Sequence, residues 1–111
     1  MPDVAEAPST SVLFEALTTL DGHIQNAKAE GPETKGVNAM RAKLLAAQLL
    51  QKHGQPGMTN HADIVAAKVA LGEDGEHQLR GETQQAKARI AEARTNYAEA
   101  VLNVLLGSME S

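Results

Sequence analysis

The feature that most constrains the fold is a long C-terminal segment, residues 76–106, in which small and apolar side chains recur along two lines. The first seam steps by four and three residues through Leu79, Thr83, Ala86, Ile90, Ala93, Tyr97, Ala100 and Val104. The second seam has the same alternating spacing and contains Ala88, Ala91, Thr95, Ala98, Leu102 and Leu105. At about 100° per residue the seams lie roughly a third of a turn apart, with the heptad spacing of coiled coils. A surface helix needs only one apolar stripe, so two seams predict a long helix that packs on two sides.

Three shorter helices are predicted before this segment, because apolar periodicity is interrupted there by glycine and proline. Their expected ranges are 11–30, 33–53 and 60–71, ended by Gly31-Pro32, by Gly54 and by the Gly72–Gly75 segment. The second helix is apolar nearly all round and is expected in the middle of the fold. Thr59 or Asn60 is the expected cap of the third. The last helix is expected to start near residue 76 or at Gly81.

The N-terminal residues 1–10 contain Pro2, Pro8 and small polar side chains, so they are expected to form a flexible tail before a helix capped by Ser11. The sequence therefore predicts an all-α fold, a small bundle of about four helices with a long C-terminal helix and a flexible N-terminal tail. The expected organisation is a tail over 1–10, a single helical domain over 11–107 and a second tail over 108–111.

Composition restricts the cellular setting. The chain has no cysteine, which excludes disulfides and thiolate sites. The first eleven residues do not resemble a signal peptide, and no run approaches the roughly 20 apolar residues that cross a bilayer. We therefore expect a protein without membrane association, in the cytoplasm.

Charge argues against general nucleic-acid binding, since the formal net charge is −4 and the ten Lys and Arg residues form no cluster in the sequence. One alternative keeps this function open. Segment 44–71 has the outline of a helix-turn-helix, although its turn contains Pro56 and its second helix offers few donors for DNA.

The histidines define a second alternative, a metal- or ligand-binding bundle, because carboxylates such as Asp21 and Asp63 lie near them in the sequence. These histidines are His23, His53, His61 and His77. The Glu-x-x-His pattern of di-iron bundles is missing, which favours solvated histidines and no metal site. The serines lie near the chain ends, and there is no glycine-rich phosphate loop. We predict neither an enzyme nor a cofactor.

The two seams allow two interpretations. Both can be filled within one chain, or one of them can contact another chain. We favour the second, because helices of about 30 Å cannot cover a helix of about 46 Å from end to end. The sequence thus predicts a non-enzymatic protein-interaction module, such as an assembly component, adaptor or small inhibitor. It would form a homo-oligomer or dock on a larger protein through the C-terminal helix.

Overall fold

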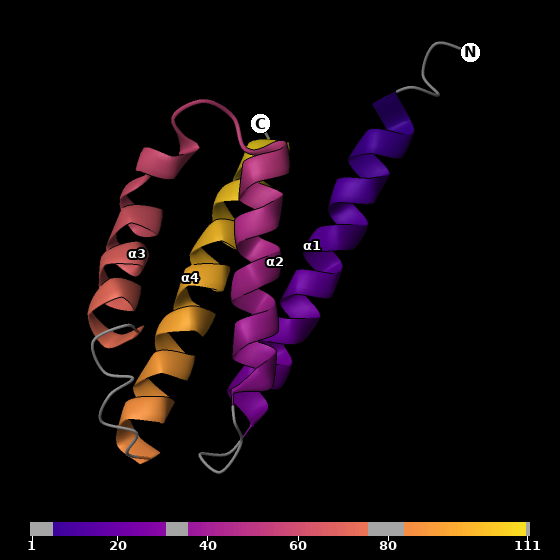
Figure 1. Cartoon of the computed structure of the whole chain (residues 1–111). Coiled ribbons are helices and arrows are strands. Elements are labelled where there is room, and N and C mark those ends of the chain that lie inside the picture. Colours follow the sequence, from indigo (N-terminus) through magenta and orange to yellow (C-terminus); the bar gives the residue numbers. More distant parts are fainter. Residues whose placement is uncertain (1–5, 31–35, 76–83, 111) are drawn as a thin grey trace.

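The helices of the protein are arranged around the C-terminal one (Figure 1). The computed structural model describes residues 6–30, 36–75 and 84–110. Its elements are α1 (Glu6–Ala29), α2 (Val37–His53), a short 3₁₀ turn η2 (Met58–Asn60), α3 (Ala62–Gly75) and α4 (Gln84–Glu110). The predicted all-α bundle with a long C-terminal helix is confirmed.

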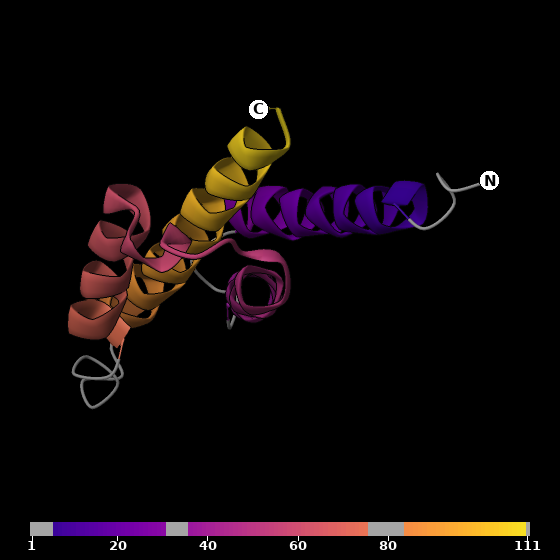
Figure 2. The ribbon, with the colours of Figure 1, turned by 90° about the horizontal axis from the view of Figure 1, so that it is seen from above.

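Helix α4 occupies the centre, since it contacts α1, α2 and α3. Helix α3 packs on α4 and η2 and makes at most marginal contact with α1 or α2. The view from above shows α1, α2 and α3 spread around α4 (Figure 2). The expectation that the second helix lies in the middle is therefore wrong. Its outward face carries Arg41, Leu44 and Gln48, all of which are exposed.

The core combines leucine and isoleucine from the outer helices with alanines of α2 and α4 and with larger apolar residues of α4. Alanine lets helix axes approach to the short end of the usual distance of about 8–10 Å. The core residues are Leu17, Leu20, Ile24, Ala42, Ala46, Leu49, Leu50, Ile64, Tyr97, Ala98, Val101, Leu102 and Leu105.

Helix α1 begins at Glu6, so the prediction of a tail through residue 10 is wrong for residues 6–10. Pro8 is compatible with this start, because the first N–H groups of a helix have no partner within the helix. Residues 1–5 lie outside the described part of the chain. The first buried side chain of α1 is Leu17, and the preceding turns extend away from the other helices (Figures 1 and 2). The molecule is accordingly elongated, with extents of 56 × 26 × 17 Å.

Helix α2 begins at Val37 rather than at residue 33, directly after Gly36, whose φ of +69° is left-handed. It ends at His53, as predicted from Gly54. The N–H of Gly54 donates to the carbonyl of Leu50 at 2.8 Å, and a Cβ on Gly54 would lie only 2.3 Å from that oxygen. Close approach of the backbone therefore requires glycine at this end.

The limits of α3 and α4 differ from the prediction. Thr59 and Asn60 lie in η2 and do not cap α3, which begins at Ala62. Helix α3 continues through Gly72 to Gly75, because a glycine weakens a helix by about 1 kcal/mol without having to end it. Helix α4 continues to Glu110, so residues 108–110 are helical and not a tail. The expected start of this helix, including Gly81, falls outside the described residues.

Candidate functional site

The first seam of α4 lies in the interior of the bundle. Ile90, Ala93 and Tyr97 are buried, and Val104 is partly buried against the core. Leu79 lies outside the described residues, and the side chain of Ala86 is not described. The described part of this seam therefore stabilises the fold of a single chain.

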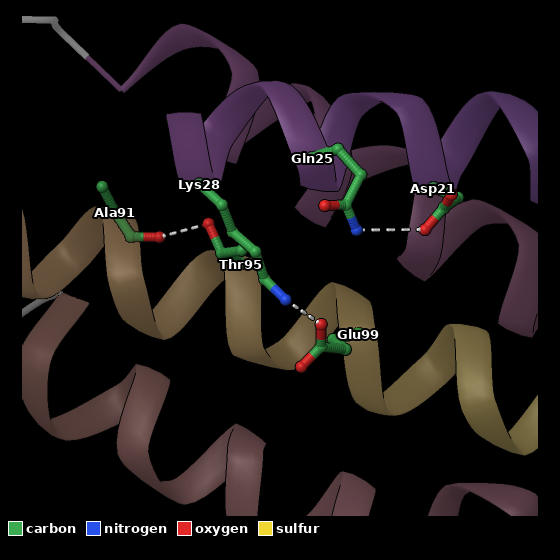
Figure 3. A network of polar contacts seen from close by, with 6 residues as sticks. All are labelled: Asp21, Gln25, Lys28, Ala91, Thr95 and Glu99. Carbon is green, nitrogen blue, oxygen red and sulfur yellow. Dashed lines mark hydrogen bonds and ion pairs between the residues drawn. The ribbon is translucent and has the colours of Figure 1, made fainter. Parts of the chain in front are cut away.

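From Ala91 onward the second seam is also covered within one chain, whereas Ala88 at its start is exposed. Ala98 is 0% exposed, Leu102 and Leu105 are buried, and Ala91 is partly buried. Thr95 is a buried polar residue, and its hydroxyl donates to the carbonyl of Ala91 at 2.8 Å (Figure 3). Its polar atom is thus satisfied inside α4.

From Ile90 onward the described residues of both seams are buried or partly buried, so this part of α4 offers no open apolar seam to another chain. The length argument that favoured an intermolecular seam compared single helices of about 30 Å with the long C-terminal helix. In the structure three helices, α1, α2 and α3, together cover different sides of α4. A surface for a partner must therefore be sought on the outer helices.

An ion pair joins the C-terminal half of α1 to α4, and a hydrogen bond lies within α1 beside it (Figure 3). Lys28 forms an ion pair with Glu99 across the two helices. The amide of Gln25 donates to Asp21 at 3.4 Å within α1. These groups are exposed, so each pair contributes less than about 1 kcal/mol. The N-terminal half of α1 has no comparable contact among the described residues.

The largest exposed apolar side chains of α1 lie in this N-terminal half. Val12 is 52% exposed and Phe14 is 58% exposed, on either side of the partly buried Leu13. At about 100° per residue, three consecutive apolar residues cover roughly 200° of the helix circumference. Only the middle of this arc, at Leu13, faces the core, and both flanks are exposed. We call Val12, Leu13 and Phe14 the α1 arc.

Other exposed apolar side chains lie on α2 and α3. Val37 and Leu44 are on the outward side of α2, and Val65 and Val69 are one turn apart on α3. Scattered apolar side chains are normal on a protein surface. They therefore serve as control positions for substitutions in the α1 arc.

A groove of about 710 Å³ lies between α2 and α3 above α4. Its described lining combines three cationic side chains, from three helices, with apolar ones. The lining residues are Lys43, Ala47, Leu50, Gln51, Thr59, Lys68, Leu71, Gly72, Arg94 and Tyr97. The sequence did not predict this groove, because its cations are far apart along the chain and only the topology brings them to one place.

Burial shifts the pKa of two groove residues. It lowers the pKa of Arg94 below its ordinary value, because a guanidinium loses hydration there. It raises the pKa of Tyr97, because the phenolate form would lose hydration. Neither side chain makes a hydrogen bond or ion pair with another described residue.

The histidines show no metal-binding arrangement in the described ranges, where no three potential ligand side chains come together. His77 lies outside these ranges. His61 precedes α3, and its Nδ1 accepts the N–H of Asp63 at 3.2 Å. His61 thus takes the capping position that was predicted for Thr59 or Asn60.

The segment 44–71 does not form a closely packed helix pair. Helices α2 and α3 run antiparallel on different sides of α4 (Figure 1). In a helix-turn-helix, two helices joined by a tight turn cross at a steep angle. This geometry gives the DNA-binding alternative no support.

Comparisons with known proteins add no relative: no family model, curated protein or solved structure matches the chain. Among the described helices, none is both long and apolar enough to pass through a lipid bilayer.

Proposed function

We propose that the protein is a non-enzymatic helical interaction module that associates with a second copy of itself through the α1 arc. One observation carries the proposal: the N-terminal half of α1 is helical and apolar over a wide arc, yet the fold covers only its middle, at Leu13, and leaves Val12 and Phe14 exposed. A helix that is apolar over so much of its circumference is normally buried on several sides.

The energetics of short helices support the same proposal. Isolated helices shorter than about 12–15 residues are marginal in water, so most helical stability in proteins comes from packing. Before Leu17, no described side chain of α1 is buried. A second α1 packed against the arc would supply the missing burial. Phe14, the only phenylalanine of the chain, would be its anchor, since aromatic residues are enriched at protein interfaces.

This proposal keeps the predicted class of function but moves its surface from α4 to α1. An assembly component, an adaptor and a small inhibitor all use surfaces of this kind, and self-association favours the first. The absence of cysteine suits a reducing compartment, so we place this function in the cytoplasm.

The test is the mass in solution by light scattering at micromolar concentration. The unchanged protein should have at least twice the chain mass of 11.7 kDa. The double variant Val12→Ser/Phe14→Ser should shift the mass towards 11.7 kDa while circular dichroism retains most of the helical signal.

The matched control is Val37→Ser/Leu44→Ser, which changes side chains of similar exposure, 49% and 55%, on α2. It should leave the mass unchanged. A monomeric unchanged protein would exclude self-association. Equal loss of association in both double variants would show that the α1 arc is not the contact surface.

A further inference from the structure

We propose that the groove between α2 and α3 binds a small amphipathic anion, a molecule with one carboxylate or phosphate group and an apolar body. This inference is independent of self-association through the α1 arc, because the groove lies between α2, α3 and α4.

The charge of the groove is opposite to that of the chain. Lys43 comes from α2, Lys68 from α3 and Arg94 from α4. The chain contains fourteen Asp and Glu residues and has a net charge of −4, yet no described lining residue is acidic. Like charges that share a groove with apolar walls repel one another, and a bound anion would remove this cost.

Arg94 is the group that most needs an anion. It is partly buried at the floor of the groove and pairs with no described carboxylate, whereas Lys28 on the other side of α4 pairs with Glu99. Charged groups taken out of water are stabilised by a partner of opposite charge. The planar guanidinium offers two parallel donors, which match a carboxylate or phosphate.

The remaining walls define the rest of the ligand. Leu50, Leu71 and Ala47 are apolar, and Tyr97 adds its ring. The Tyr97 hydroxyl is a further donor that no described residue uses. A volume of about 710 Å³ falls within the range of about 300–1,000 Å³ that is typical of small-molecule sites. The apolar body of such a ligand would pack between the leucines, and its acidic group would bind Arg94.

The chain carries its own reporter for this site. Tyr97 is the only tyrosine and there is no tryptophan, so intrinsic fluorescence comes from the groove. Octanoate and octyl phosphate, added separately, should each change this fluorescence saturably. Their relative affinities distinguish a carboxylate ligand from a phosphate ligand. Octanol, which lacks the charge, and inorganic phosphate, which lacks the apolar body, should both bind at least about tenfold more weakly.

Two pairs of variants locate the binding. Arg94→Gln should weaken binding of the tighter-binding probe by about tenfold or more. Arg41→Gln, the same charge change on the outward face of α2, should leave the affinity for this probe unchanged. Lys43→Gln and Lys52→Gln form a second pair with the same expectation. If circular dichroism shows that Arg94→Gln does not fold, the second pair tests whether binding depends on the groove cations.

Several results would overturn the inference. These are the absence of saturable binding, equal loss in the groove and control variants, and octanol binding as tightly as octanoate. Tighter binding of a single-stranded oligonucleotide, weakened equally by Arg94→Gln and Arg41→Gln, would also overturn it, because the cations would then act as a diffuse surface for a polyanion.

Discussion

Helices α3 and α4 are both rich in alanine and apolar residues, but the fold treats them differently. Helix α4 is covered by three helices, and its buried side chains come from both seams and from Val101, which belongs to neither. Helix α3 contacts α4 and η2, and Ile64 is its only side chain among the described residues that is fully buried. Alanine on a helix face thus permits a close neighbour but does not indicate how many neighbours are present.

The largest expected effect separates the inner side of α3 from its outer side. Ile64→Ala should lower the free energy of unfolding by about 2–5 kcal/mol, because it removes the side chain that holds α3 on α4. Val65→Ala, on the exposed side, should change it by less than about 1 kcal/mol. Urea unfolding followed by circular dichroism measures both values. Similar losses in the two variants would show that α3 is buried on its outer side as well.

A second substitution compares α3 with α4 directly. Ala98 is 0% exposed on α4, whereas Ala66 is exposed on α3. Ala98→Leu should lower the free energy of unfolding by about 1–3 kcal/mol through overpacking. Ala66→Leu should change it by no more than about 0.5 kcal/mol. Urea unfolding followed by circular dichroism measures both changes in the free energy of unfolding. A neutral Ala98→Leu would mean that α4 has space around it and that the difference between the helices is smaller than burial indicates.

The fold class could be predicted because helical periodicity depends on local sequence. Two seams on residues 76–106 required packing on two sides of the last helix, and Gly54 correctly marked the end of α2. The predicted helix limits that were wrong depend on weaker local effects. Pro8 fits in the first turn of α1, and Gly72 lowers helix stability without ending the helix.

The candidate surfaces could not be predicted because they depend on which helices are neighbours. The periodicity of α4 does not distinguish a partner in the same chain from one in another chain, and the structure shows the described residues of both seams covered internally from Ile90 onward. Phe14 is one of three consecutive apolar residues, and their sequence is the same whether or not the bundle covers these side chains. Lys43, Lys68 and Arg94 share a groove only because α2 and α3 lie on either side of it.

The smallest expected effect concerns Tyr97 and the cover that α3 gives it. Burial raises the pKa of the Tyr97 phenol above its ordinary value near 10. The neutral phenol therefore contributes stability that is fully present below the pKa of the unfolded chain and is lost as the pH rises through the pKa of the folded protein. Tyrosinate absorbance should titrate at higher pH in the native protein than in urea, and Tyr97→Phe should remove this titration. Because Leu71 and Lys68 of α3 line the same groove as Tyr97, Ile64→Ala should move the native midpoint back towards the value in urea. An unchanged midpoint in Ile64→Ala would show that α2 and α4 alone bury the ring and that the cover α3 gives to α4 does not reach Tyr97.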